Sequence, residues 1–148
     1  MAEIFFVCTG NTCRSPMAAT LAAAIFAREG ISITVKSAGV AAASGSPASK
    51  HAIAAMQLEK LDLSGHASQA AAAEVLAKAA LILTMTKAHL NRVKSIIPTA
   101  NAYTLGEFAD SLVEISDPFG GSLDEYKTCA AQIKTLLEAC AEKFRGLV

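Results

Sequence analysis

Short apolar runs alternate along the chain with segments whose apolar residues recur every three or four positions. The runs predict strands over 3–7, 31–36, 80–84 and 102–105. Helical spacing predicts helices over 16–29, 47–59, 69–78, 87–96 and 122–144. The first run includes four consecutive apolar residues, which is typical of a parallel strand covered on both faces. Strands alternating with helices favour a doubly wound α/β fold of the flavodoxin-like kind, and residues 1–148 are expected to form a single domain.

Capping residues predict where the elements begin and end. Ser15 and Pro16 suit the N-cap and first position of the first helix, because Ser can accept an N–H bond and Pro lacks only an amide that would stay unpaired. Gly30 is expected to end that helix, and Ser122 to cap the last one. The segment 37–49 is rich in Gly, Ser and Ala and predicts an irregular connection.

Charge and hydropathy exclude two broad classes of partner. The chain has 13 Lys and Arg against 13 Asp and Glu, so its formal net charge is zero at pH 7. We therefore expect no nucleic-acid partner bound over a broad basic surface, although one small phosphate site remains compatible with this balance. The longest nearly apolar stretch, 17–27, is shorter than the ~18 residues that a membrane span needs, so no membrane partner is expected.

The four cysteines, Cys8, Cys13, Cys129 and Cys140, are expected to be thiols. The first residues carry no basic leader, which favours the cytoplasm, where disulfide frameworks are rare. No Cys-x-x-Cys motif or His-rich neighbourhood is present, so neither a zinc site nor another cofactor is expected. Cys129 and Cys140 lie in the last predicted helix and are expected to fill the core.

The candidate chemistry lies between the first strand and the first helix. Cys8 and Arg14 are separated there by five residues, and Ser15 follows. A loop of this length can direct several backbone N–H groups to one centre, and the positive end of the next helix adds to this anion site. Arg14 can hold two phosphate oxygens, while Cys8 lies beneath the phosphorus with its thiolate favoured. Ser15 can donate a hydrogen bond to the sulfur. These features predict a nucleophile inside a phosphate cradle.

The Cys–Arg spacing alone is weak evidence, since it arises by chance in roughly one chain in ten of this composition. The buried strand before the loop, Gly-Asn inside it and Ser-Pro after it make the pattern specific. The alternative is that Cys8 is a buried strand-end cysteine and Arg14 a solvent-facing cap residue. That alternative does not explain why a short polar loop follows the most hydrophobic strand.

Phosphoryl transfer also requires a proton for the leaving group. The candidate acid is Asp117, in the sequence Asp-Pro-Phe-Gly-Gly, because such a turn can hold a side chain over a cleft. By local sequence alone this segment is more typical of an ordinary turn. A Walker-type nucleotide site is excluded, because no Gly-Lys-Ser/Thr follows the first loop.

These motifs, together with Ser37-Ala38-Gly39 and His66, resemble the low-molecular-weight protein tyrosine phosphatase family over essentially the whole chain. The resemblance implies a four-stranded parallel sheet with helices on both faces, no metal, and a phosphocysteine intermediate. It implies Cys8 as nucleophile, Arg14 as phosphate clamp, and Asp117 as acid and then as base for the attacking water. It also implies a polar network that supports the loop through Asn11, Ser37 and His66. The further residues expected at the substrate or phosphate are Thr9, Gly10, Asn11, Thr12, Cys13, Ser15 and Phe119.

Three departures from the tyrosine-specific members are similar to the bacterial protein-arginine phosphatase branch. Thr12 stands where Ile or Leu is usual, Phe119 is a single aromatic where two are usual, and Met85 is followed by Thr86 rather than Asp. A Thr hydroxyl can accept an N–H of a phosphorylated guanidinium, which an aliphatic wall would leave unpaired at ~1–3 kcal/mol. Phe119 could stack on the flat group. We therefore favour phosphoarginine on proteins as the substrate, with phosphotyrosine as the alternative. The possibility that Thr12 reflects neutral drift at a tolerant position stays open.

Two other classes compete with a phosphatase. Arsenate reductases of this fold need a thiol near the third strand, and the segment 80–86 contains none. A non-catalytic phosphate-binding module would be expected to lose the nucleophile or the acid. The expected partners are phosphorylated proteins, and a monomer is the expectation for the oligomeric state.

Cys13 has two interpretations. It can be a small buried residue behind the loop, or a resolving thiol that traps oxidised Cys8 as a reversible disulfide.

Overall fold

One four-stranded parallel sheet forms the centre of the molecule, and the computed structural model describes all of residues 1–148. Its strand order is β2-β1-β3-β4, as expected for a doubly wound sheet. The strands are β1 (Ala2–Cys8), β2 (Ile33–Gly39), β3 (Leu81–Thr84) and β4 (Ala102–Thr104). The helices are α1 (Arg14–Glu29), α2 (Lys50–Leu58), α3 (Ala73–Leu76), α4 (Lys87–Ile96), α5 (Leu105–Phe108), α6 (Leu123–Ala139) and α7 (Ala141–Phe144), with a final 3₁₀ turn over Arg145–Leu147.

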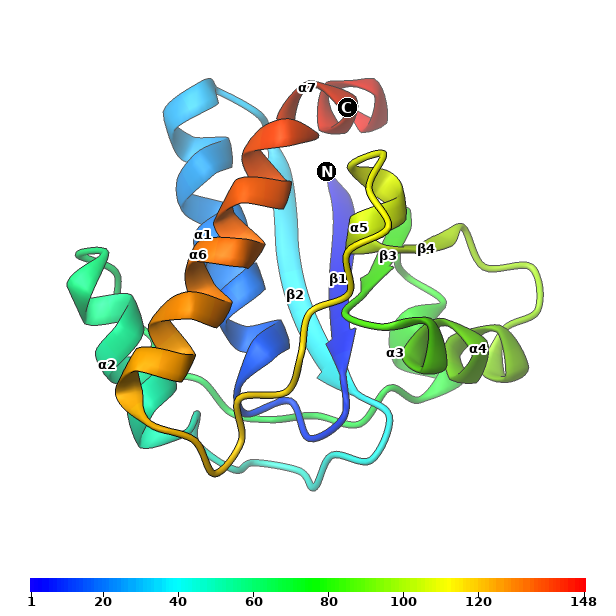
Figure 1. Cartoon of the computed structure of the whole chain (residues 1–148). Coiled ribbons are helices and arrows are strands. Elements are labelled where there is room, and N and C mark those ends of the chain that lie inside the picture. The colour runs from blue at the N-terminus through cyan, green and yellow to red at the C-terminus, as the bar shows by residue number, and fades with distance from the viewer.

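Successive side chains of β1 point to opposite faces of the sheet, and both faces are covered. Ile4, Phe6 and Cys8 belong to the larger core beneath α1 and α6. Phe5 and Val7 belong to a smaller core with residues of α3 and α4. Figure 1 shows α1 and α6 side by side on one side of the sheet and α3 and α4 on the other. This double coverage explains why the first strand is apolar without interruption.

The carboxyl ends of the parallel strands meet at one edge of the sheet, where ligands bind in folds of this kind. The loop between β1 and α1 lies at this edge, at the lower end of β1 in Figure 1. The segment that leads into α6 passes close to it. The fold therefore brings residues 8–15 and the region around Asp117 to one place.

Tertiary contacts overrule three expectations from local sequence. Ser37–Gly39 is not irregular but the end of β2, because it pairs with the last three residues of β1. The helix predicted over 69–78 shrinks to α3, because the chain near Ala70 bridges to Gly39 instead. Ser15 is not the N-cap of α1, which begins at Arg14 with Cys13 at the cap position.

Other element boundaries follow the sequence with smaller changes. Gly30 ends α1 in the left-handed conformation with φ 67°, and Ser122 caps α6 with a capping box, as predicted. The last helix is interrupted at Cys140, which separates α6 from α7. Leu105 starts the unpredicted α5 rather than ending β4.

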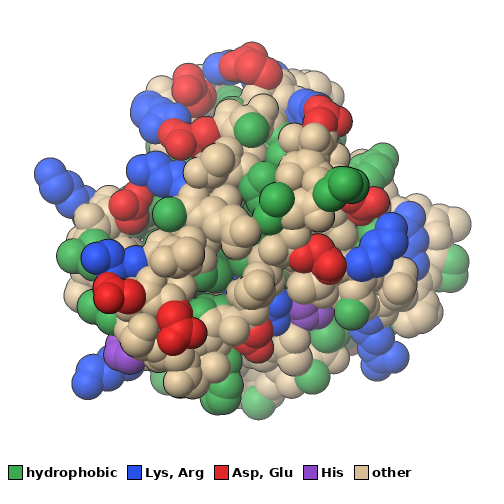
Figure 2. Space-filling model, in the orientation of Figure 1, with side chains coloured by type: hydrophobic (Ala, Val, Ile, Leu, Met, Phe, Trp, Pro, Cys, Tyr) green, Lys and Arg blue, Asp and Glu red, His purple; other side chains and the backbone are tan.

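The surface carries mixed charges. Figure 2 shows acidic and basic side chains interspersed on the visible face, without an extended patch of one sign. No helix combines the length and the apolar character that a membrane span requires.

Candidate active site

The loop that follows β1 has unpaired backbone donors. None of the backbone N–H groups of residues 9–15 donates a hydrogen bond within the protein, and no side chain caps the start of α1. More than nine in ten buried backbone N–H groups of folded proteins find a partner. A run of free N–H groups at the positive end of a sixteen-residue helix is therefore a site for an anion.

The Cys8 sulfur lies beside this run of donors, buried at the end of β1. Its partner is the Ser15 hydroxyl, with Sγ and Oγ 2.9 Å apart. The Asn11 amide nitrogen donates to the same hydroxyl oxygen at 2.8 Å. Because Ser15 accepts from Asn11, its own proton can be donated to the sulfur, which at 2.9 Å is nearer than its other acceptor, the Ala38 carbonyl oxygen at 3.5 Å. Ser15, predicted both as cap and as sulfur partner, serves only as the second.

Asn11 holds the loop in shape from its centre. It is fully buried and has a φ of 57°, a left-handed conformation that Asn tolerates better than most residues. Its side chain donates to the Ser37 hydroxyl at 3.0 Å and accepts the Gln69 N–H at 3.0 Å. His66 Nε2 donates to its carbonyl at 2.7 Å. The structure thus brings Asn11, Ser37 and His66 together, and adds Gln69.

Gly39 is necessary for the approach of β2 to this loop. A Cβ at Gly39 would lie 2.4 Å from the Thr9 carbonyl oxygen and 2.9 Å from the Asn11 nitrogen. Both atoms belong to the loop backbone, so only glycine allows this close packing.

Arg14 is turned toward the site and is 4% exposed, so it is not a solvent-facing cap residue. Its NH1 donates to the Ile115 carbonyl at 2.9 Å, and its NH2 lies 3.4 Å from the Thr9 hydroxyl. The same NH2 lies 3.6 Å from Oδ2 of Asp117. The guanidinium is therefore fixed in place before any ligand arrives, which favours tight binding of a phosphate.

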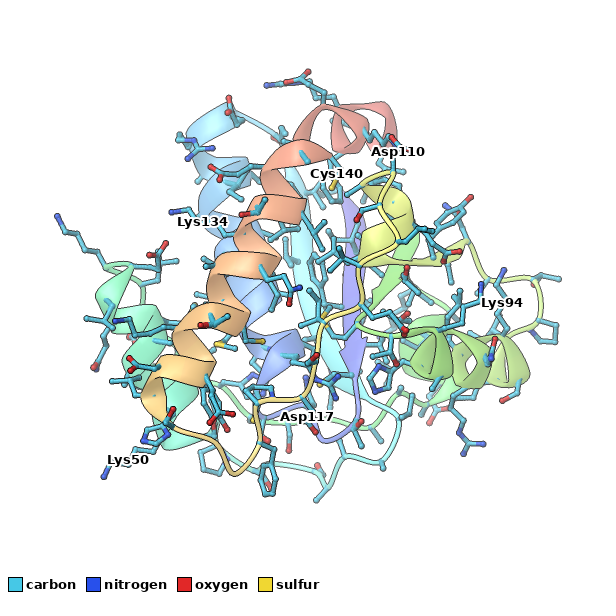
Figure 3. All side chains as sticks on the ribbon, in the orientation of Figure 1. Lys50, Lys94, Asp110, Asp117, Lys134 and Cys140 are labelled. Carbon is cyan, nitrogen blue, oxygen red and sulfur yellow. The ribbon has the colours of Figure 1, made fainter.

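A pocket of about 200 Å³ opens over the loop. Its lining residues are Cys8, Thr9, Gly10, Thr12, Cys13, Arg14, Asp117 and Phe119. Figure 3 shows Asp117 on the segment leading into α6, next to the loop after β1. Asp117 accepts the Phe119 N–H at 3.0 Å through Oδ1, which fixes the turn. The Phe119 ring is 76% exposed, so it stands free at the rim.

A second cavity, of about 530 Å³, lies on the other side of Asp117 between Ser116 and Gln132. It is larger, but none of the loop residues 8–15 lines it. The smaller pocket is therefore the candidate site.

Besides Gln69, sequence reasoning missed a residue at the pocket itself. His89 Nε2 lies 2.8 Å from the Thr9 hydroxyl, and the imidazole is almost completely buried. Burial, and then the nearby Arg14 charge, lower the pKa of His89 to about 4, so the ring is neutral at pH 7. His89 follows the end of β3 by five residues, and the shared carboxyl edge of parallel strands was the available signal.

The other cysteines differ in their surroundings. Cys129 and Cys140 are buried in the larger core, as expected, and burial raises the pKa of Cys129 to about 12 and that of Cys140 to about 11. Cys13 Sγ lies 3.2 Å from the Tyr126 hydroxyl and 3.5 Å from that of Ser49. Burial, followed by this contact with Cys13, raises the pKa of Tyr126 to about 12.

No cluster of three or more His, Cys, Asp or Glu side chains is placed to ligate a metal ion.

Comparison with known proteins decides which family this arrangement represents. Residues 3–146 match the model of the low molecular weight phosphotyrosine protein phosphatase family. The chain belongs to this family.

Relatives within the family carry two kinds of name. The chain is 39% identical to a protein-arginine-phosphatase of Bacillus subtilis, with 97% of each chain covered. It is 37% identical to the low molecular weight protein-tyrosine-phosphatase PtpB of Staphylococcus epidermidis, covering 92% of this chain and 94% of the relative. A solved structure of the YwlE arginine phosphatase superimposes with a TM-score of 0.93, at 38% identity and 99% coverage of both chains. That protein is a cysteine-to-serine mutant whose active-site serine is phosphorylated.

Proposed function

We propose that this protein is a metal-independent cysteine phosphatase that removes the phosphoryl group from phosphoarginine on proteins. The observation that carries the proposal is the run of unpaired N–H groups at residues 9–15 beside the Cys8 sulfur. These donors, with Arg14, match a phosphoryl group that carries negative charge on three oxygens.

The first step transfers the phosphoryl group to the protein. The Cys8 sulfur attacks phosphorus, an S–P bond forms, and the P–N bond to the arginine side chain breaks. Asp117, at the pocket rim and 3.6 Å from Arg14, gives its proton to the departing nitrogen. The backbone N–H groups and Arg14 hold the three equatorial oxygens throughout.

The second step releases phosphate. Asp117 accepts a proton from a water molecule, whose oxygen attacks phosphorus while the S–P bond breaks. The electron pair of that bond returns to the Cys8 sulfur, and the Ser15 hydroxyl 2.9 Å away stabilises it by a hydrogen bond. Inorganic phosphate leaves and the free enzyme is restored.

Thr12 favours the guanidinium as leaving group. It lines the pocket, and its only side-chain partner is the Cys13 sulfur at 3.7 Å, a weak contact. Its oxygen is therefore available to a guanidinium N–H. Phe119, exposed at the rim, offers one flat face over the same group. The arginine phosphatases among the relatives support the same choice.

The proposal extends to the whole chain and its setting. Residues 1–148 act as one phosphatase domain, with phosphorylated proteins as partners. All four cysteines are free thiols, which suits the cytoplasm, and a monomer suffices because one chain supplies every residue named above.

The test compares kcat/KM for phosphoarginine and phosphotyrosine peptides of otherwise identical sequence. Wild type is expected to prefer phosphoarginine, and Cys8→Ser to lose more than about a thousandfold of activity while it still binds inorganic phosphate. Thr12→Val removes only the hydroxyl and is expected to lower kcat/KM for phosphoarginine by roughly 5- to 150-fold, with phosphotyrosine unaffected. Thr12→Ser keeps the hydroxyl and serves as the control.

Phosphotyrosine is the second candidate, favoured by the relatives that bear the tyrosine phosphatase name. Preference of wild type for the phosphotyrosine peptide would establish it and reject the arginine assignment. Full activity of Cys8→Ser would reject the phosphatase mechanism itself.

A further inference from the structure

The contact between His89 and Thr9 joins two distant parts of the chain at the pocket. His89 lies in the first turn of α4, and Thr9 follows β1, 80 positions earlier. Thr9 lines the phosphate pocket and is an exposed residue. The imidazole behind it is buried, at 6% exposure.

The hydrogen bonds around His89 fix its tautomer. The backbone N–H of Thr86 donates to His89 Nδ1 at 3.2 Å, and a backbone amide is always a donor. The Thr86 hydroxyl lies 2.9 Å from the same nitrogen; its oxygen accepts the His89 N–H, so its proton is available to Nδ1 as well. Nδ1 therefore carries no proton, and in the neutral ring the proton sits on Nε2. Nε2 must then donate to the Thr9 hydroxyl oxygen, 2.8 Å away.

The direction of the Thr9 proton follows from this assignment. Thr9 Oγ1 accepts from His89 Nε2, and Arg14 NH2 lies 3.4 Å from the same oxygen as a second donor. Both lone pairs of the hydroxyl are then engaged. No acceptor within the protein takes the remaining Thr9 proton, and the pocket is the open space beside it.

We propose that His89 is a positioning residue: anchored on Thr86, its ring turns the Thr9 hydroxyl into a hydrogen-bond donor aimed at a phosphoryl oxygen. The inference rests on the proposed function, since it adds one side-chain donor to the backbone N–H groups that hold the phosphoryl group. A fixed donor pairs with phosphoryl oxygens but not with the N–H groups of a guanidinium, so it also sets the orientation of the substrate.

A simpler role for His89 needs to be separated from this one. His89 and Thr86 form a capping box at the start of α4. Capping uses only Nδ1, and Glu or Gln is the usual residue at that position. The bond from Nε2 to Thr9 is not part of the cap, so the two roles can be tested independently.

The experiment is a double-mutant cycle on Thr9→Val and His89→Leu, with two readouts: kcat/KM for a phosphoarginine peptide and the Kd of inorganic phosphate. Each single variant is expected to weaken both by about tenfold, the size of one hydrogen bond to a charged oxygen. The double variant is expected to be no worse than Thr9→Val alone, because the imidazole acts through the hydroxyl. Additive losses, or wild-type values for His89→Leu, would overturn the inference.

Two further variants separate positioning from capping. His89→Gln offers both an acceptor for Thr86 and a donor for Thr9, and is expected to restore most of the lost binding. Glu107→Ala removes the corresponding capping residue of α5, away from the pocket, and is expected to leave both readouts unchanged. A loss in Glu107→Ala equal to that in His89→Leu would assign the effect to capping.

The outcomes also distinguish this inference from the proposed function. If wild type binds phosphate but does not turn over phosphoarginine, the phosphate Kd values still complete the cycle. If His89→Leu does not fold, Thr9→Val and Thr9→Ser carry the test. Weak phosphate binding by the first and normal binding by the second supports the inference, and equal binding by both overturns it.

Discussion

The N–H groups at the starts of α1 and α6 differ in whether side chains of the protein cap them. At α6, the Ser122 hydroxyl accepts the Glu125 N–H, Glu125 reaches back to the Ser122 N–H, and two acidic residues lie in the first turn. At α1 no side chain caps the helix and its first turn has no acidic residue. Both helices are long, so both have a positive end. The protein neutralises one of these ends itself and leaves the other for a ligand.

The largest effect is expected from a substitution that displaces the loop at the uncapped end of α1. Gly39→Ala would drive a Cβ into the Thr9 carbonyl and the Asn11 nitrogen, both in the loop backbone. We expect a loss of about 2–3 kcal/mol in unfolding free energy and at least roughly a hundredfold in kcat/KM, because the loop must shift. Gly146→Ala meets no atom within 4 Å and is the control. Equal activity of the two variants would contradict the importance of this close approach.

Acid should destabilise the fold through His89, which lies in α4 and contacts Thr9 in the loop before α1. The pKa of His89 is about 4 in the folded protein and near 6.5 in an unfolded chain, so between these values the unfolded state binds the extra proton. The stability contributed by the neutral ring is therefore present above pH 6.5 and is lost as the pH falls through 4, by about 2 kcal/mol.

The measurement is urea unfolding of wild type and His89→Gln at pH 7 and pH 4.5. Other groups titrate equally in both proteins, so the difference between their pH dependences isolates His89. Parallel pH profiles for the two proteins would show that His89 is protonated equally in both states.

Ser15→Ala should affect the sulfur specifically. The variant leaves Cys8 Sγ without its 2.9 Å partner, so the sulfur is a poorer leaving group. We expect kcat to fall by about tenfold and a phosphoenzyme to accumulate, detected as a burst of the dephosphorylated product. Ser37→Ala removes the other acceptor of the same Asn11 amide without touching the sulfur, and is expected to give no burst.

The smallest effect is expected at the capped end. Ser122→Ala should cost about 1 kcal/mol of stability and leave kcat/KM unchanged, because this cap serves only the helix. Thermal unfolding and peptide kinetics on one preparation check both statements. A loss of activity beyond the loss of folded protein would mean that the two helix ends are not independent.

The sequence predicted the fold well wherever neighbouring residues alone determine a helix or a strand. The uninterrupted apolar run of β1, the glycine that ends α1 and the Ser122 cap each depend on neighbouring residues, and each was predicted. The prediction of a helix over 69–78 was wrong because its helical pattern competes with the bridge between Gly39 and Ala70, a contact between residues far apart in sequence. Such pairings leave no local pattern.

The candidate site likewise contains residues that the local sequence revealed and residues that it did not. Cys8, Arg14 and their spacing were visible because they share one loop, and the structure brings Arg14 inward beside Asp117 from a segment a hundred residues away. Ser15 was misassigned as a helix cap because Ser before Pro has that local signature, whereas its hydroxyl is used by the sulfur. His89 escaped notice because its partner Thr9 is on another strand end, and only the sheet brings them together.

The bond from Arg14 to the Ile115 carbonyl couples the two halves of the reaction. Ile115 lies two residues before Asp117, so the residue that we propose to hold the phosphoryl group also anchors the peptide that carries the proposed acid. Because the guanidinium is fixed before a substrate arrives, this peptide is held in place as well. A substitution that frees Arg14 would therefore also loosen the segment that carries Asp117.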